Sequence, residues 1–342
     1  MPPVTPASST IRLRAVNHAE ADRCARGFAD LTYTQDPGYA LEAAARVGAA
    51  AEFFAFEQGE GSLAGYAALR VRHIPVIGGG LAYLHGGPVT RLPGGTCEPE
   101  RLAGCLAALA RHCAARKLTL RVSPPADADA DETLRRLGFA PTGASDGTTI
   151  VLDLAPSLED LRARLAGKWR TDLNRGERGG LRVVRSAEAK DVAALQPLLS
   201  DLAKRKGFGV AQDARFFARA AAHGMTGDPA FVAHLAYRGE ELVAGHVGAF
   251  AGDTAVYLLG AADAAGREAR AAFVLQWAVI EYAKARGLRR YDLGGIDRAA
   301  NPQVYRFKAR MGGTEIERPA VWETRGGALR PALIALAERV RR

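Results

Sequence analysis

A short strand that ends in two glycines is the segment best suited to place a ligand against the backbone. Tyr291, Asp292 and Leu293 form the predicted strand, and Gly294 and Gly295 follow it. Glycine has no Cβ, so a ligand can approach the backbone closely there. Ligands also bind at the carboxyl ends of strands in open α/β sheets. We therefore predict a substrate-binding turn that involves Tyr291, Gly294 and Gly295; the alternative is a tight turn packed beneath the next helix.

A lysine follows this turn in a short predicted helix. An Asn-Pro pair is a typical start signal and opens a helix over residues 301–311. Lys308 lies in that helix, flanked by Tyr305 and Phe307, and we expect one of these two aromatic side chains to face the core. An ammonium group fixed beside a forming oxyanion would lower the barrier to acyl transfer. The alternative is a surface lysine on an amphipathic helix.

Positive charge is concentrated in the second half of the chain. Residues 1–154 hold 15 Lys and Arg against 16 Asp and Glu, whereas residues 155–342 hold 31 against 21. This asymmetry would attract a polyanion, such as a nucleic acid, a nucleotide-linked substrate or an anionic membrane surface. An ordinary solvated basic face is the alternative. We predict phosphate contacts from cations near one helix end and from a second basic cluster: Lys168, Arg170, Arg175, Arg178, Arg205 and Lys206.

The elements that must position these residues occur twice in the same order. Each half is predicted to contain a strand, two helices, three meandering strands, a long helix, a strand, a helix and a final strand. A hairpin meander followed by a helical crossover to a parallel strand is an α/β arrangement. The final strands are predicted over residues 148–154 and 314–321. We expect one domain over residues 1–155, a second over 156–330, and a C-terminal helix over 331–342 that packs back on the body.

Length and composition bound the class of protein. The chain has 342 residues, of which 48% are hydrophobic and 24% charged, as in a globular protein of about two domains. No apolar run is long enough to span a membrane, and the first ten residues lack the features of a signal peptide, so we expect a cytoplasmic protein. Four cysteines without a CxxC pair predict reduced thiols, and seven scattered histidines predict no metal site. No ATP-binding loop of the G-x-x-x-x-G-K-[ST] type occurs.

Two segments resemble motifs of the Fem family of aminoacyl-tRNA-dependent peptidyltransferases. The first runs from Lys168 to Leu181. The second runs from Gly287 to Gly313 and contains a Tyr-Asp-x-Gly-Gly strand end and a later Phe-Lys pair. The repeated element order in turn resembles the acyltransferase fold of GCN5-related N-acetyltransferases (GNAT), present twice. The resemblance implies two tandem GNAT-like domains, each a mixed, mostly antiparallel sheet flanked by helices.

The resemblance also implies a reaction. The family builds the interpeptide bridge of peptidoglycan, so the chain would transfer an amino acid from aminoacyl-tRNA to the amine of a peptide, an amino acid or a peptidoglycan precursor. Lys308 matches the family's catalytic lysine, which stabilises negative charge as the amine attacks the ester. Asp292 would orient the amine or accept its proton, and Tyr305 and Phe307 would contact substrate. The ester is already activated, so no cofactor or metal is expected beyond the aminoacyl-tRNA co-substrate.

The first half departs from the family pattern. Members that act on the nucleotide-linked wall precursor usually carry a Gln-Ser-x-x-Trp stretch followed by a lysine. Here Gln35 and Tyr39 stand for the glutamine and the tryptophan, and Ala43 stands where the lysine would fall. We predict that Gln35 and Tyr39 contact the acceptor, a small peptide or a nucleotide-linked peptide.

Two alternatives remain open. One is an N-acyltransferase that uses acyl-CoA or an acyl carrier in polysaccharide or natural-product biosynthesis. GNAT proteins hold the CoA pyrophosphate at a glycine-containing turn before the long helix. The matching residues 267–272 place Arg270 at the first glycine, which argues against CoA in this half. The other alternative is a non-catalytic protein of the same fold that binds RNA or an anionic surface.

Overall fold

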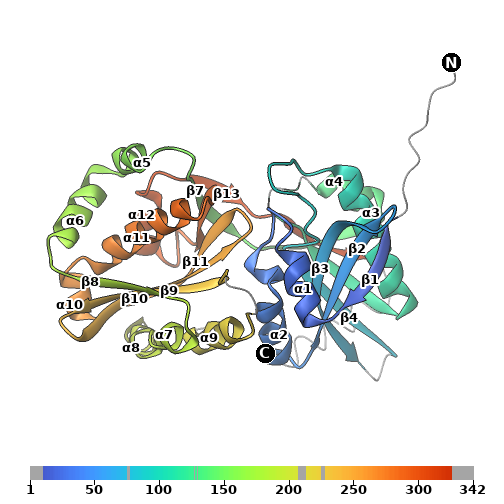
Figure 1. Cartoon of the computed structure of the whole chain (residues 1–342), viewed down its shortest axis with the longest axis horizontal. Coiled ribbons are helices and arrows are strands. Elements are labelled where there is room, and N and C mark those ends of the chain that lie inside the picture. Colours follow the sequence, from blue (N-terminus) through green and yellow to red (C-terminus); the bar gives the residue numbers. More distant parts are fainter. Residues whose placement is uncertain are drawn as a thin grey trace, which may run out of the picture. The chain divides into compact units, whose positions relative to one another are not determined.

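The described residues form two compact units, one within 11–146 together with 319–325 and the other within 147–318 (Figure 1). The structure, a computed structural model, describes residues 11–74, 78–126, 128, 130–206, 213–224 and 228–325. Each unit contains one seven-stranded mixed sheet with helices packed on it, so the predicted α/β class with two sheets is confirmed. The predicted tail over residues 1–10 and the predicted C-terminal helix lie outside the described residues.

The first unit is built on a sheet with the strand order β1-β2-β3-β4-β5-β14-β6. Its strands are β1 (Arg12–Val16), β2 (Ala50–Gln58), β3 (Ser62–Ile74), β4 (Gly79–His85), β5 (Leu118–Ser123), β6 (Phe139–Ser145) and β14 (Ala320–Thr324). Its helices are α1 (His18–Ala25), the short 3-10 helix η1 (Tyr33–Gln35), α2 (Pro37–Arg46), α3 (Pro99–Ala115) and α4 (Asp131–Arg136). Leucines of α3 pack against β4 and β5 in the core of this unit.

The second unit repeats this plan with the strand order β13-β7-β12-β11-β10-β9-β8. Its strands are β7 (Thr148–Asp153), β8 (Arg182–Ser186), β9 (Phe231–Arg238), β10 (Glu241–Ala251), β11 (Thr254–Ala262), β12 (Arg290–Ile296) and β13 (Thr314–Glu317). Its helices are α5 (Leu158–Arg164), α6 (Gly167–Glu177), α7 (Ala189–Ala193), α8 (Gln196–Lys206), α9 (Ala214–Ala222), α10 (Ala264–Glu268), α11 (Ala271–Ala285) and α12 (Pro302–Ala309). The parallel pair of this sheet is β11 with β12, as β4 with β5 is in the first.

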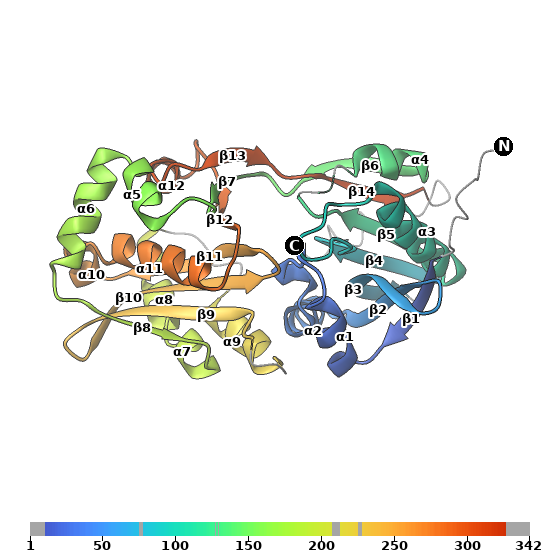
Figure 2. The ribbon, with the colours of Figure 1, turned by 45° about the horizontal axis from the view of Figure 1, so that its top comes forward.

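Two strands belong to different units from those that the sequence predicts. The strand predicted to close the first half is β7, and it pairs with β12 and β13 of the second unit. The single strand predicted over residues 314–321 is two strands, because Pro319 has no N–H to continue the ladder. β13 stays in the second unit, whereas β14 pairs with β5 and β6 of the first, as Figure 2 shows. The boundaries therefore fall after Asp146 and after Arg318 rather than at residues 155 and 330.

The glycine turn and the helix that carries Lys308 are positioned by the centre of the second sheet. Gly287, with φ of +74°, ends α11 and turns the chain into β12. β12 lies between β7 and β11, and its parallel ladder with β11 runs from Thr254–Arg290 to Val256–Asp292. The register with β7 shifts between Asp292 and Gly295, where the predicted turn begins. Among the described residues, no helix is both long and apolar enough to cross a membrane.

Candidate active site

Lys308 is a buried ammonium fixed at the end of β12. Its side chain is only 6% exposed, although it is charged and lies on a short helix. Its Nζ donates to the carbonyl oxygens of Gly295 at 2.8 Å and Gly294 at 3.3 Å, and it lies 5.1 Å from the ring centroid of Tyr257. An ammonium group has three N–H donors. Two of them are directed at the turn, so the third is not taken by a hydrogen bond within the described part of the chain.

The surroundings of Lys308 tune its protonation. Burial lowers the pKa of Lys308 from 10.5 to about 8, the neighbouring Asp292 carboxylate opposes this shift, and the Arg318 guanidinium adds to it. The face of an aromatic ring also attracts a cation, so Tyr257 favours the charged form. With a pKa of about 8, Lys308 is mainly an ammonium at neutral pH. It can therefore stabilise negative charge on an oxygen.

Asp292 holds the glycine turn in shape. Its Oδ1 accepts a hydrogen bond from the Gly294 N–H at 2.7 Å and another from the Thr149 hydroxyl, and its Oδ2 accepts from Arg318 at 2.8 Å. Gly294 has φ of +74°, and a Cβ there would lie 2.7 Å from the carbonyl oxygen of Tyr257. Both carboxylate oxygens are thus already engaged. This arrangement favours the orienting role predicted for Asp292 over proton acceptance, with the turn rather than the amine as the group it orients.

A cavity of about 530 Å³ opens beside the turn and is lined mainly by charged groups. Its lining residues are Thr148, Ile296, Asp297, Arg298, Glu315 and Glu317. Tyr305, predicted to contact substrate, donates its hydroxyl to Glu315 at 2.8 Å and stacks under the Arg298 guanidinium. The Glu315 carboxylate raises the pKa of Tyr305 through this hydrogen bond. Tyr305 therefore fixes a carboxylate of the cavity wall.

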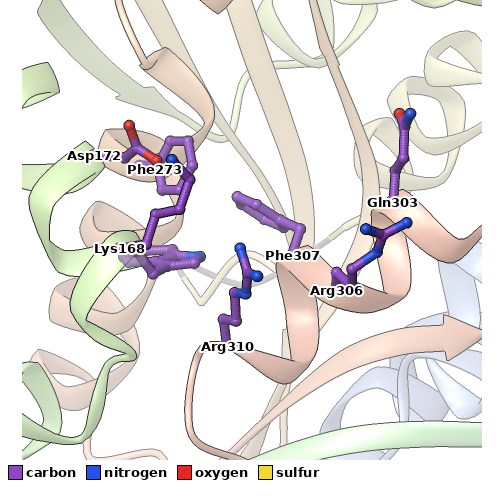
Figure 3. A pocket seen from close by; sticks show the side chains of 8 residues that line it. Lys168, Asp172, Phe273, Gln303, Arg306, Phe307 and Arg310 are labelled. Carbon is purple, nitrogen blue, oxygen red and sulfur yellow. The ribbon is translucent and has the colours of Figure 1, made fainter.

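A second cavity, of about 260 Å³, lies between α6, α11 and α12 (Figure 3). Phe307 lines it, next to Lys308 along α12. The other lining residues are Lys168, Trp169, Asp172, Phe273, Gln303, Arg306 and Arg310. The predicted contacts Lys168 and Phe307, which are far apart in the sequence, are thus brought together in one cavity.

The fold that carries this site is similar to that of known proteins. Residues 160–309 match a family model described as an acetyltransferase (GNAT) domain. A solved structure of FemX is similar with a TM-score of 0.80 at 17% identity, and the match covers 94% of this chain and 99% of FemX. The chain has the FemX fold. The resemblance that the two motifs indicate is therefore confirmed at the level of the fold, and these findings support an acyltransferase.

Other solved structures share the fold more distantly. The C-terminal domain of a putative lysylphosphatidylglycerol synthetase from Agrobacterium fabrum is similar with a TM-score of 0.57 at 12% identity, covering 93% of this chain and 96% of that domain. A conserved protein of unknown function from Bacteroides thetaiotaomicron has a TM-score of 0.58 at 12% identity, covering 92% of this chain and all of that one. No match was found among curated proteins.

In this chain α6 packs against the start of α11, at the turn that the sequence analysis compares with the CoA-binding turn of GNAT proteins. Arg270 adopts a left-handed conformation, with φ of +58°, at the N-cap of α11, and its guanidinium pairs with Asp172 of α6 at 3.0 Å. A Cβ at Gly176 would lie 3.1 Å from the Arg270 carbonyl oxygen and 2.7 Å from Val274. Arg270, which stands where the CoA-binding turn would have a glycine, therefore holds α6 against the N-terminus of α11.

The other predicted phosphate contacts are not brought into either cavity. Arg170 donates to the Ala163 carbonyl at 3.1 Å, and Arg178 donates to the Asn174 carbonyl at 3.1 Å. Arg175 is exposed on α6. Two cations lie at the end of α8: Arg205 donates to the Ala262 carbonyl at 3.3 Å, and the side chain of Lys206 lies outside the description. These residues are a surface charge distribution rather than one site.

Tyr291 belongs to the core and not to the turn. Its side chain is fully buried, and its hydroxyl donates to Gln276 at 2.7 Å and lies 3.3 Å from Nε2 of His246. Burial raises the pKa of Tyr291 well above its usual range. Successive residues of a strand point to opposite faces, so Tyr291 faces the core while Asp292 faces the turn. Its position does not support the predicted contact with substrate.

Gln35 and Tyr39 are also structural in the first unit. The Gln35 amide is fully buried, donates to the carbonyls of Ala68 at 3.1 Å and His85 at 2.8 Å, and accepts from the Ala68 N–H at 2.7 Å. It therefore ties η1 to β3 and β4. Tyr39 is 5% exposed and packs edge-to-face on Tyr33, with ring centroids 5.1 Å apart. Neither side chain is available to an acceptor in this structure.

Several residues of the site are missed by the sequence prediction. Tyr257, Thr149 and Arg318 reach the turn from β11, β7 and the segment after β13. Their places depend on strand pairing, which no local pattern specifies. Arg306 and Arg310 could have been predicted as neighbours, because their spacing of four residues places them on one face of α12. The described residues contain no group of three or more His, Cys, Asp or Glu side chains able to hold a metal ion.

Proposed function

We propose that the chain is an aminoacyltransferase that forms an amide bond by moving an amino acid from aminoacyl-tRNA to the amine of a peptide, an amino acid or a peptidoglycan precursor. The observation that carries the proposal is the buried Lys308 ammonium at the glycine turn of a FemX fold. The Fem-like strand end and Phe-Lys pair supply the resemblance to a tRNA-dependent family. Because its donor is made in the cytoplasm, the proposal places the reaction there.

The chemistry needs only this chain and its two substrates. The acceptor nitrogen attacks the ester carbonyl carbon, forming the C–N bond and placing negative charge on the carbonyl oxygen. The remaining N–H of Lys308 stabilises that oxyanion, as a preorganised donor does in a site shielded from water. The C–O bond to the ribose then breaks. The nitrogen loses a proton and the departing ribose oxygen gains one, which could pass through the substrate itself.

The cavity beside Gly295 supports an amine-bearing acceptor. Three carboxylates, those of Asp297, Glu315 and Glu317, line it against one guanidinium. Carboxylates attract an ammonium group and disfavour an anionic ligand. Ile296 lines this cavity and directly follows Gly295, whose carbonyl binds Lys308. An amine held in the cavity would therefore approach the turn from this end of β12.

Acyl-CoA transfer is the competing function. Arg270 holds α6 against the start of α11, where a GNAT protein would bind the CoA pyrophosphate. This packing argues against CoA binding in the second unit. The test combines purified protein, charged tRNA and an amine acceptor, and measures deacylated tRNA and amide product. We expect product from charged tRNA and no consumption of acetyl-CoA. Product from acetyl-CoA without tRNA would overturn the proposal.

Lys308→Met separates catalysis from RNA binding. Loss of one oxyanion donor typically lowers kcat by about 10² to 10³. We expect a loss of this size with tRNA affinity nearly unchanged. Lys190→Met removes an exposed lysine from α7 and is the matched control. Equal losses of turnover and affinity in Lys308→Met would make Lys308 a binding residue, and RNA binding without turnover by the wild type would indicate a non-catalytic protein.

A further inference from the structure

The Tyr257 ring that faces Lys308 lies over a glycine of its own strand. A Cβ at Gly260 would collide with the Tyr257 hydroxyl and lie 2.9 Å from its Cζ, closer than real Cβ atoms come to other heavy atoms. Glycine within a strand often marks such a close approach. Because Gly260 has no side chain, Tyr257 can lie along β11 instead of standing away from the sheet. The glycine therefore provides the space that the tyrosine occupies.

A bulge gives Tyr257 and Gly260 the same face of the sheet. Residues three apart in a regular strand face opposite sides. Here the register of β10 with β11 shifts between Val247 and Gly248, so that Leu258 is an extra residue in β11. A bulge of this kind redirects the side chains beside it. Tyr257 consequently shares a face with Gly260 and can lie over it.

His246 borders the same space from the neighbouring strand. It pairs directly with Gly260 across the ladder of β10 and β11. His246 is only 1% exposed, and its ring centroid lies 4.9 Å from that of Tyr257, with the planes at 60°. Tyr257 cannot tilt toward β10 without meeting the imidazole. Gly260 and His246 together therefore define one position for the ring, in which its face is turned to Lys308.

The imidazole of His246 is surrounded by neutral groups. His234 of β9 lies beside it, with ring centroids 6.0 Å apart, and the Tyr291 hydroxyl of β12 lies 3.3 Å from its Nε2. The polar group of α11 here is Gln276, which accepts from the Tyr291 hydroxyl at 2.7 Å. Burial lowers the pKa of His246 well below its ordinary value, and His234 adds to this shift. A neutral imidazole does not compete with the lysine ammonium for the face of Tyr257.

We propose that His246 is a positioning residue for the Lys308 ammonium and acts through the ring of Tyr257. His246 is not among the residues that line either cavity, so it acts without touching substrate there. The inference rests on the proposed function, because Lys308 is the group that would stabilise the oxyanion. Loss of the imidazole frees the Tyr257 ring to move and weakens its contact with Nζ of Lys308, 5.1 Å from the centroid. Lys308 then loses its proton more readily.

The test measures the pKa of Lys308 without turnover. Protein that carries isotope-labelled lysine is titrated with pH, and the NMR shift of the Lys308 Cε is followed; its signal is the one that disappears in Lys308→Met. Removal of the ring in Tyr257→Leu should lower the pKa of Lys308 by about one pH unit, as loss of a desolvated cation–π contact does. His246→Ala should lower it in the same direction by a smaller amount. His246→Phe keeps a ring of similar size and should retain the wild-type value.

A double variant tests whether the effect passes through Tyr257. The Lys308 pKa in His246→Ala/Tyr257→Leu should equal that in Tyr257→Leu alone, because the ring is the link between the two side chains. The matched control is His234→Ala, which removes an equally buried imidazole that contacts His246, Phe250 and Tyr282. It should leave the pKa of Lys308 nearly unchanged. Additive shifts in the double variant, or equal shifts in the two histidine variants, would overturn the proposal.

The glycine offers a second route to the same ring. Gly260→Ala should push Tyr257 away and lower the pKa of Lys308, which keeps the proposal testable where His246→Ala does not fold. Its control is Gly167→Ala in α6, where a Cβ meets nothing within 4 Å. A wild-type pKa of Lys308 in Gly260→Ala would show that the seat of the ring does not matter.

Turnover separates this inference from the proposed function. In an active enzyme, the falling limb of the pH–rate profile should move to lower pH in His246→Ala and stay in place in His234→Ala. Turnover with charged tRNA, together with an unmoved pKa of Lys308 in His246→Ala and Gly260→Ala, overturns the positioning role and leaves the function intact. The expected pattern of pKa values without amide product from charged tRNA supports the positioning role and overturns the function.

Discussion

The Lys308 ammonium lies against the face of the Tyr257 ring, 5.1 Å from its centroid. A buried lysine tends to lose its proton, whereas the face of an aromatic ring and nearby carbonyl oxygens favour the charged form. The contact joins α12 to β11 at the point where the glycine turn leaves β12. The pKa of Lys308, about 8, therefore lies close to neutral pH, and a change in its protonation can be followed by varying the pH.

The pH dependence of turnover tests the charge on Lys308. Its pKa of about 8 predicts that single-turnover rates fall as pH rises through about 8, because the ammonium is lost. Asp292 raises the pKa of Lys308 and Arg318 lowers it. Asp292→Asn should therefore move the falling limb to lower pH, and Arg318→Gln should move it to higher pH. Rates that rise through pH 8 would instead indicate that the neutral amine acts as a base.

Burial of Lys308 predicts a specific effect on stability. The folded pKa of about 8 lies below the ordinary value of 10.5, so the unfolded chain binds more protons between these values and stability rises with pH there. Below pH 8 the buried charge costs about 3 kcal/mol. Lys308→Met removes this cost, so its stability advantage over wild type should shrink by about 2 kcal/mol between pH 7 and pH 10. Urea titrations at both pH values measure the difference, and a constant difference would contradict the prediction.

Gly294 and Gly295 differ in what a side chain would meet. Gly294 has φ of +74°, and its Cβ would collide with the Tyr257 carbonyl, whereas a Cβ at Gly295 meets nothing within 4 Å. Gly294→Ala should destabilise the protein by more than about 1 kcal/mol through backbone strain and the clash. Gly295→Ala should leave the melting temperature near wild type and raise KM if substrate passes there. Equal melting temperatures in the two variants would refute this distinction.

Tyr291→Phe tests whether this tyrosine serves packing. The variant leaves the buried Gln276 oxygen without its donor, which should cost about 1 to 2 kcal/mol of unfolding free energy. Because the ring stays in the core, kcat/KM should not change. Tyr305→Phe is the contrasting variant, since it frees Glu315 at the cavity and should change KM with little effect on stability. A fall in kcat/KM for Tyr291→Phe at unchanged stability would restore the substrate contact that the sequence predicts.

Local patterns predicted most elements of the fold but not all of them, and not all of their pairings. Periodicity and turn residues miss β6 (Phe139–Ser145), and the single strand expected over residues 314–321 is β13 and β14. The sheet to which β7, β13 and β14 belong depends on partners far away in the sequence. The sequence of Thr148–Asp153 is typical of a strand in either sheet. Its pairing with β12 of the second unit could therefore not be predicted from the segment alone.

The candidate site shows the same limit, with one missed signal. The turn at Gly294 and the helix of Lys308 are local features, and both were predicted. Tyr257 comes from another strand, and no spacing links it to them. For Tyr291, however, the alternation with Asp292 and Leu293 was visible: Leu293 is apolar, and Tyr291 shares its face of the strand. The Tyr-Asp-x-Gly-Gly motif favoured a substrate contact for Tyr291, whereas the alternation of side chains along the strand indicated that Tyr291 faces the core.

The return of β14 to the first sheet has a consequence for synthesis. This strand lies between β5 and β6, yet it is made after the entire second unit. Domains generally fold as they emerge from the ribosome, the N-terminal one first. Here the sheet of the first unit would lack β14 between β5 and β6 until the second unit has been translated. A message that stops after Arg318 would leave two open strand edges in the first unit, and such edges invite aggregation.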